Sequence, residues 1–296
     1  MAEAAISERT AEGGRTTVGD LPRAGEIFSR ASGENFSVAS LILGRRVREH
    51  LLAVYGYARL VDQIGDASPG DRLAQLDTLE RELDRIYSGA GPSGHPVLAR
   101  LAPSIDSLRL PRGPFQRLIE ANRRDQETVA YATFDELVGY CDLSANPVGE
   151  LVLHVFGIAT PDRIALSDKV CTALQLAEHW QDVAEDRAAG RTYLPAEDMA
   201  RFGVTDADLE GHAARPALKE LMAFEVARGR KLLDDGAVLV SRLHGRARLA
   251  VAGYVGGGRA AFESIALAGY DVLSGAPKAT RLRRARATAS TYARRR

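Results

Sequence analysis

Apolar residues recur every three or four positions along most of the chain, starting at about Phe36. This spacing is typical of amphipathic helices, and it is clearest in residues 71–87, 210–240 and 243–254. Runs of β-branched residues that alternate with period two are few, so the pattern gives no convincing strand. Turn-forming residues separate the helices at 68–70, 89–96, 110–113 and around Pro195. The pattern therefore predicts a single all-α domain.

The two ends of the chain differ from this helical middle. Residues 1–20 are polar, lack the apolar segment of a secretory signal, and predict a disordered tail. Residues 278–296 contain eight basic residues and no acidic residue, which predicts a basic tail. Such a tail is either solvated or makes a weak electrostatic contact with anionic lipid. We therefore expect one all-α domain over residues 21–277, flanked by two tails.

Composition excludes several classes of protein. A formal net charge of zero argues against a nucleic-acid-binding protein. The two cysteines, Cys141 and Cys171, form neither a disulfide framework nor a metal-binding spacing, which favours reduced thiols. The best apolar run, residues 151–159, is too short to span a bilayer and is interrupted by His154. We expect a cytoplasmic protein that is at most peripheral at the inner face of a membrane.

Two pairs of aspartates carry most of the chemical information. Asp62 and Asp66 lie in LVDQIGD, and Asp182 and Asp186 lie in EHWQDVAED. Each pair is spaced i, i+4 in a predicted helix, so its two carboxylates are one turn apart. Both pairs continue the apolar face of their helix, where unpaired carboxylates lose hydration. Positive charge is therefore expected beside them.

Two kinds of positive charge fit these pairs. Magnesium prefers oxygen ligands and commonly bridges carboxylates to substrate phosphates. Glu178, one turn before Asp182, adds a further carboxylate to the same row. The alternative is a set of salt bridges to Arg59 and Arg191, whose guanidinium groups also suit phosphate oxygens. Both interpretations stay open at this level, and the two arginines would suit an anionic substrate.

Three strings of this sequence resemble the squalene and phytoene synthase family. They are AVYGYARLVDQIGD, ALQLAEHWQDVAEDRAAGRTYLP and the closing GYDVLSG, and the resemblance covers residues 36–282. The family implies an all-α isoprenoid synthase bundle with a central active-site cavity. Within it, SANPVGELVLHVFG and EHWQDVAED are most similar to the hydroxysqualene synthases of the bacterial hopanoid route.

This resemblance implies an enzyme that takes presqualene diphosphate, releases diphosphate and adds water. It also implies roughly two or three magnesium ions and no NADPH. A presqualene diphosphate synthase would supply the substrate, and a flavin-dependent reductase would convert the product to squalene. The alternatives are squalene synthase with NADPH, presqualene diphosphate synthase and phytoene synthase. A non-catalytic helical partner of a companion synthase is the alternative from a different class.

The resemblance also implies roles for individual residues. Asp62 and Asp66 match the first aspartate-rich motif, and Asp182 and Asp186 match the second. The expected catalytic and metal-binding residues are Asp62, Asp66, Asp182, Asp186 and Glu178. The expected substrate-binding residues are Arg59, Gln175, Gln181, Arg191, Tyr193, Asn146, Tyr55 and Asn35.

Several positions depart from the family pattern. Gln63 stands where a second acid usually follows the first aspartate, and Gln181 stands where many members have arginine. Glu178 stands where many members have asparagine, and the segment 34–37, which includes Asn35, replaces a serine-rich diphosphate-binding segment. These departures disfavour the first condensation of two farnesyl diphosphates. They fit an enzyme that acts on the later intermediate.

Overall fold

The computed structural model describes residues 16–29, 43–91 and 94–294. Within these ranges the chain forms helices and no strand, which confirms the all-α prediction. One isolated parallel bridge joins Ala130 and Thr192. Asn35 and its segment, expected to bind substrate, lie outside the described residues.

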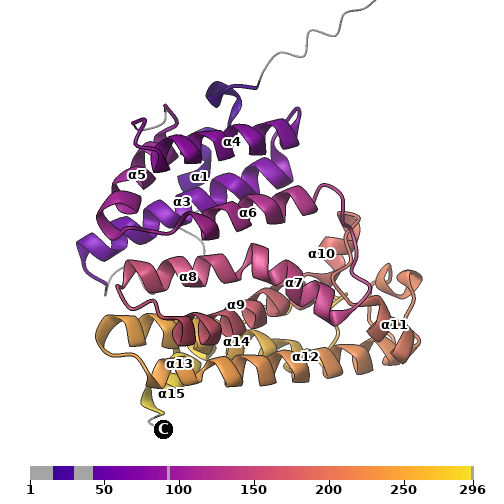
Figure 1. The fold of residues 1–296 in the computed structure, drawn as a ribbon. Coiled ribbons are helices and arrows are strands. Elements are labelled where there is room, and N and C mark those ends of the chain that lie inside the picture. The colour runs from indigo at the N-terminus through magenta and orange to yellow at the C-terminus, as the bar shows by residue number, and fades with distance from the viewer. Residues whose placement is uncertain (1–15, 30–42, 92–93, 295–296) are drawn as a thin grey trace, which may run out of the picture.

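The N-terminal helices pack around α3 (Figure 1). Tyr57, Leu60 and Ile64 of α3 are completely buried in this first core. The break predicted at 68–70 is present, and the Asp71 side chain caps the next helix by accepting from the Ala74 amide at 2.9 Å. The helices of this half are α1 (Ala24–Ser29), α3 (Arg45–Ala67), α4 (Arg72–Tyr87), α5 (Pro96–Leu108) and α6 (Arg112–Arg124).

The C-terminal helices pack around α9 and enclose a second core, in which Trp180 and Phe262 are completely buried. The two cores meet at α8, because Leu151 belongs to the first and Leu153 to the second. The helices of this half are α7 (Phe134–Ser144), α8 (Asn146–Val155), α9 (Pro161–Gln181), α10 (Val183–Ala188), α11 (Ala196–Phe202), α12 (Pro216–Gly236), α13 (Val238–Ser241), α14 (Gly245–Leu267) and α15 (Arg281–Ala293).

The prediction of a disordered N-terminal tail needs correction at its end. Residues Val18–Asp20 form a 3-10 helix, and Asp20 accepts from both the amide and the hydroxyl of Thr17. The hydroxyl of Thr78 on α4 donates to the carbonyl of Thr16 at 3.2 Å. These hydrogen bonds fix residues 16–20 on α4, whereas residues 1–15 lie outside the described ranges.

The prediction of a basic C-terminal tail also needs correction. Residues Arg281–Ala293 form α15, which packs antiparallel to α14. The contact depends on Gly256, where a Cβ atom would lie 2.5 Å from the backbone nitrogen of Thr288. Thr291 is buried in the same contact and accepts from Arg259 at 2.8 Å. Glycine thus lets the two helices approach closely, and the segment is folded.

Two further features bear on the predicted class of protein. Across the described ranges, no helix is long and apolar enough to cross a membrane. Cys141 and Cys171 are free thiols, as the sequence predicted.

Backbone between residues 125 and 133 is not helical, although the pattern gave no break there. This break matters, because it forms part of the site described next.

Candidate active site

The first aspartate pair lies on the last two turns of α3. Arg59 Nη1 lies 3.6 Å from Asp62 Oδ2, one turn away. The side chains of Asp62 and Asp66 are 43% and 58% exposed, so the row opens toward solvent at the end of the helix. Desolvation by the surrounding protein atoms raises the pKa of the Asp62 carboxyl to about 7. Arg59 opposes this rise of the pKa, and the carboxylate of Asp66 adds to it.

Gly65, between the two aspartates, lets α6 approach α3. A Cβ atom at this position would overlap the side-chain amide of Asn122. That amide also lowers the pKa of the Asp62 carboxyl, against the rise caused by desolvation. The Gly65 carbonyl accepts from Gln126 at 3.1 Å and from Arg72 at 3.0 Å. The end of α6 is therefore fixed beside the first aspartate pair.

Asp125 is a fifth aspartate of this site, which sequence reasoning missed. The hydroxyl of Tyr140 donates to Asp125 Oδ2 at 2.8 Å, and Asp125 Oδ1 is buried without a hydrogen-bond partner among the described residues. Burial raises the pKa of the Asp125 carboxyl to about 6, and Asp66 adds to the rise, whereas the Tyr140 hydrogen bond and Arg191 oppose it. Asp125 has no acidic neighbour one turn away, so the spacing rule that found the other four gives no signal here.

The second aspartate pair lies where α9 meets α10, which corrects the prediction of one continuous helix. Helix α9 ends at Gln181, and Asp182 leaves the helical region with φ −106° and ψ 18°. The Asp186 amide still donates to the Asp182 carbonyl at 2.8 Å, so the two residues remain one turn apart. Burial and the nearby Glu185 raise the pKa of the Asp182 carboxyl, and Lys278 opposes the rise.

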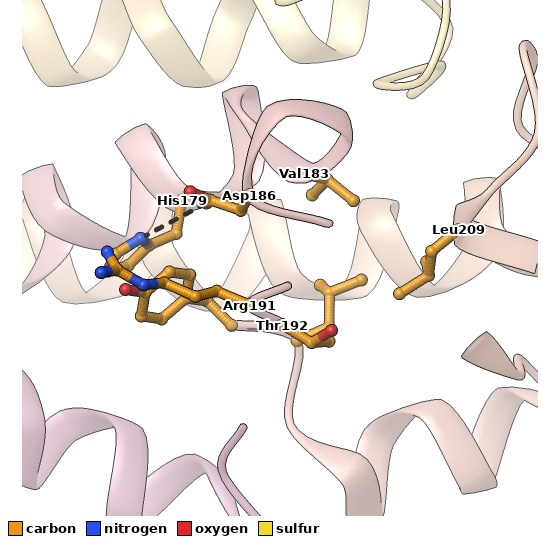
Figure 2. Close-up of a pocket in the computed structure, with 8 residues that line it drawn as sticks. His179, Val183, Asp186, Arg191, Thr192 and Leu209 are labelled. Carbon is orange, nitrogen blue, oxygen red and sulfur yellow. Dashed lines mark ion pairs between the residues drawn. The ribbon is translucent and has the colours of Figure 1, made fainter. Parts of the chain in front are cut away.

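The loop after α10 connects the two pairs. Arg191 Nη1 lies 3.2 Å from Asp66 Oδ1 on α3. The ring of Tyr193 stacks on His179 with centroids 3.6 Å apart. His179 Nδ1 in turn lies 3.8 Å from Asp186 Oδ2, the contact marked by a dashed line in Figure 2. One loop therefore contacts the first pair directly and the second pair through His179.

His179 is a second residue that the sequence did not single out. Its ring is 7% exposed, and burial lowers its pKa, so the imidazole is neutral at pH 7. The Gln175 amide nitrogen lies 3.2 Å from its Nε2. If that amide donates, the imidazole proton sits on Nδ1 and faces Asp186. Gln175 thus reaches the site through His179.

The remaining predicted substrate-binding residues have different surroundings. Tyr55 is 6% exposed on α3, two turns before Asp62. Gln181 donates through its amide to the carbonyl of Pro277. Asn146 is 1% exposed, donates to Asp142 Oδ1 at 2.6 Å and accepts from the Thr172 hydroxyl at 3.0 Å. The Asn146 amide joins α7, α8 and α9, and these contacts give no support for a substrate-binding role.

The acidic side chains of the candidate site offer the oxygen ligands that magnesium prefers. Asp62, Asp66, Asp125, Asp182 and Asp186 supply only carboxylate oxygens, and Glu178 is exposed one turn before Asp182. In the described part of the chain, no three histidine, cysteine or acidic side chains are gathered as a metal site. Both salt bridges of the alternative interpretation, Arg59–Asp62 and Arg191–Asp66, are present.

A small pocket lies between these groups. His179, Asp186, Arg191 and Thr192 are among its lining residues (Figure 2), and its volume of about 10 Å³ has room for about one water molecule. The larger central cavity stays a prediction, because residues 30–42 lie outside the described ranges.

Comparison with known proteins identifies the family. The squalene/phytoene synthase family matches residues 29–286. A hydroxysqualene synthase from Rhodopseudomonas palustris is 35% identical over 214 residues, 71% of each chain. A presqualene diphosphate synthase from the same organism is 35% identical over 201 residues, 67% of this chain and 71% of the relative. The crystal structure of squalene synthase HpnC from Alicyclobacillus acidocaldarius has a TM-score of 0.78 at 40% identity and covers 86% of this chain and 99% of that chain. This chain belongs to the squalene/phytoene synthase family and is an enzyme with the all-α isoprenoid synthase fold.

Proposed function

We propose that this enzyme is a hydroxysqualene synthase, which converts presqualene diphosphate and water into hydroxysqualene and diphosphate. The observation that carries the proposal is the loop after α10, which ties Arg191 to Asp66 and stacks Tyr193 on His179 beside Asp186. It supplies a cation for diphosphate next to carboxylates from both motifs. The similarity to a hydroxysqualene synthase supports the choice within the family.

The first step breaks the carbon–oxygen bond of the substrate, and the electron pair leaves with the diphosphate. Arg59 and Arg191 stabilise the developing negative charge, because their guanidinium donors match phosphate oxygens. Roughly two or three magnesium ions, held by Asp62, Asp66, Asp182, Asp186 and Glu178, would supply further positive charge to the leaving group.

The second step captures a carbocation. The cyclopropylcarbinyl cation left by ionisation rearranges to an allylic cation, and a water oxygen forms the new carbon–oxygen bond. The oxonium proton then passes to solvent or to the released diphosphate. Glu178 is exposed beside Asp182 and is our candidate for holding this water, whereas Asn146 is engaged in the core.

The proposed reaction has consequences for partners. No NADPH is needed, because the carbocation is captured by water and not by a hydride. A presqualene diphosphate synthase would supply the substrate, and a flavin-dependent reductase would remove the hydroxyl of the product. Substrate and product are long isoprenoids, so peripheral contact with a membrane belongs to the same proposal.

Two other activities have specific support. Squalene synthase activity is favoured by the similarity to the squalene synthase HpnC of known structure. Presqualene diphosphate synthase activity is favoured by the similarity to the presqualene diphosphate synthase from Rhodopseudomonas palustris. Separate incubations with farnesyl diphosphate and with presqualene diphosphate, each with and without NADPH, distinguish them. We expect an alcohol from presqualene diphosphate in both of its incubations. A hydrocarbon that requires NADPH would overturn the proposal in favour of squalene synthase, and presqualene diphosphate made from farnesyl diphosphate would favour the other relative.

A non-catalytic partner would behave differently from all of these enzymes. Such a protein would be inert with every substrate and would stimulate a companion synthase. The pairing of Arg59 and Arg191 with the first aspartates is compatible with either role. Turnover by the purified protein alone decides against the non-catalytic partner.

A further inference from the structure

Helix α15 has one face on the bundle and one face in solvent. Its inner face packs on α14 through Thr288 and Thr291. In Figure 1 the helix lies at the lower edge of the molecule, away from α4 and α5 at the upper edge. Its outer face consists of the exposed residues Arg281, Leu282, Ala285, Arg286, Ala289, Ser290, Tyr292 and Ala293, followed by Arg294.

The outer face carries positive charge that the protein leaves unneutralised. Arg281, Arg286 and Arg294 form no ion pair with any residue that the structure describes. Residues 278–296 contain no acidic side chain that could neutralise them. Arg283, toward α14, is different, because it lies 3.6 Å from Glu263. A surface with this charge attracts anionic groups.

Apolar side chains lie among these arginines. Leu282 is 69% exposed and Tyr292 is 41% exposed. Leu267 is 64% exposed at the end of α14 where α15 begins, because the two helices run antiparallel. Basic residues interleaved with exposed leucine and aromatic side chains are the pattern of a helix that lies in a membrane interface. The phosphate backbone of a nucleic acid would gain nothing from the exposed leucines.

The start of α15 is connected to the active site. The carbonyl of Pro277 accepts a hydrogen bond from Gln181, the residue before Asp182. The segment that leads into the N-terminal end of α15 therefore contacts the residue before the second aspartate motif.

We propose that the outer face of α15 binds anionic lipid headgroups, with Leu282 and Leu267 entering the boundary with the acyl chains. The lipid-binding surface is inferred from the charge and exposure of α15. The role of lipid binding in reaching the substrate rests on the proposed function. A long isoprenoid diphosphate dissolves in a bilayer, and docking through α15 brings the aspartate site to the membrane that holds it.

The experiment measures sedimentation of the full-length protein with vesicles. Vesicles of phosphatidylglycerol and phosphatidylcholine are compared with vesicles of phosphatidylcholine alone, at low and high salt. The test variant is Arg281→Gln/Arg286→Gln. The matched control is Arg81→Gln/Arg100→Gln, which removes the same net charge from exposed positions on α4 and α5. A third variant, Leu282→Ser, removes the apolar contact at a position too exposed to affect folding.

We expect the wild type and the control to bind the phosphatidylglycerol vesicles in a salt-sensitive manner. The test variant should bind the vesicles at least about tenfold more weakly than the wild type. Leu282→Ser should also weaken binding. Equal loss in control and test variants, equal binding to both vesicle types, or tighter binding to an RNA oligonucleotide than to vesicles would overturn the proposal. Turnover of detergent-dispersed presqualene diphosphate should be unchanged in all variants, so failure of the proposed reaction is seen separately from failure of lipid binding.

Discussion

The guanidinium group of Arg191 lies 3.2 Å from the carboxylate of Asp66, although 125 residues separate them in the chain. This pair joins the end of α3 to the loop after α10. Two residues further on, Tyr193 stacks on His179, which faces Asp186. The loop thus contacts the first aspartate motif directly and the second through His179.

Replacing Arg191 tests the role of this loop. In Arg191→Gln we expect kcat for diphosphate release to fall about a hundredfold, because a charged donor to the leaving group is lost. Arg191→Lys should restore only part of the rate, since an ammonium cannot form the two-pronged contact of a guanidinium. Thermal unfolding should change little, because an exposed ion pair contributes about 0–1 kcal/mol. Loss of folding together with activity would contradict a role at the diphosphate.

Replacing Asp182 tests the second motif. Asp182→Asn should lower diphosphate release about a hundredfold or more, because the carboxylate proposed to hold magnesium becomes neutral. The fold should persist, since desolvation and Glu185 already disfavour the charge at this position. Asp235→Asn is the matched control, because Asp235 is 44% exposed on α12 and pairs with Lys231 on the surface. Near-normal turnover in Asp182→Asn, measured by phosphate release after pyrophosphatase treatment, would refute the metal-binding role.

Gly65→Ala tests the contact between α3 and α6. The added Cβ atom meets the Asn122 amide, so the helices must separate, and we expect the free energy of unfolding to fall by about 1–3 kcal/mol. The comparison is Gly257→Ala in α14, where a Cβ atom meets open space and the helix gains about 1 kcal/mol. Urea denaturation measures both. Equal effects of the two substitutions would show that Gly65 is not a packing position.

Glu225 on α12 gives the protein a pH-dependent stability outside the site. It is fully buried, and neither carboxylate oxygen has a hydrogen-bond partner in the part of the chain that the structure describes. Burial raises its pKa to about 8, and Arg228 opposes this rise. Because the folded state holds a proton that the unfolded state releases near pH 4.5, stability from this group falls as pH rises from about 4.5 to about 8. Glu225→Gln should flatten this fall in chemical denaturation. A slope unchanged by the substitution would contradict the assignment.

Local spacing predicted the all-helical character of the chain correctly, and the role of the four paired aspartates stays a prediction. The capped start of α4 at Asp71 and the break at 68–70 can be predicted from neighbouring residues in the sequence. The end of α9 at Gln181 cannot be predicted in this way. The following VAED continues a helical pattern, and the Asp182 amide still donates to the Glu178 carbonyl. The break at Asp182 therefore has no signal in the adjacent residues.

Tertiary packing explains the other misses. Asp125 enters the site because α6 packs on α3 and Tyr140 reaches it from α7, which no local pattern encodes. Helix α15 lacks an apolar stripe, because small residues fill its contact with Gly256. Hydrophobic periodicity therefore gave a tail where the structure has a packed helix.

The oxygen of the product tests the proposed reaction most directly. The purified protein is incubated with presqualene diphosphate and magnesium in heavy-oxygen water, without NADPH, and the product is analysed by mass spectrometry. We expect a hydroxysqualene that carries one heavy oxygen atom from solvent. No turnover, a hydrocarbon product, or an alcohol without heavy oxygen would contradict it.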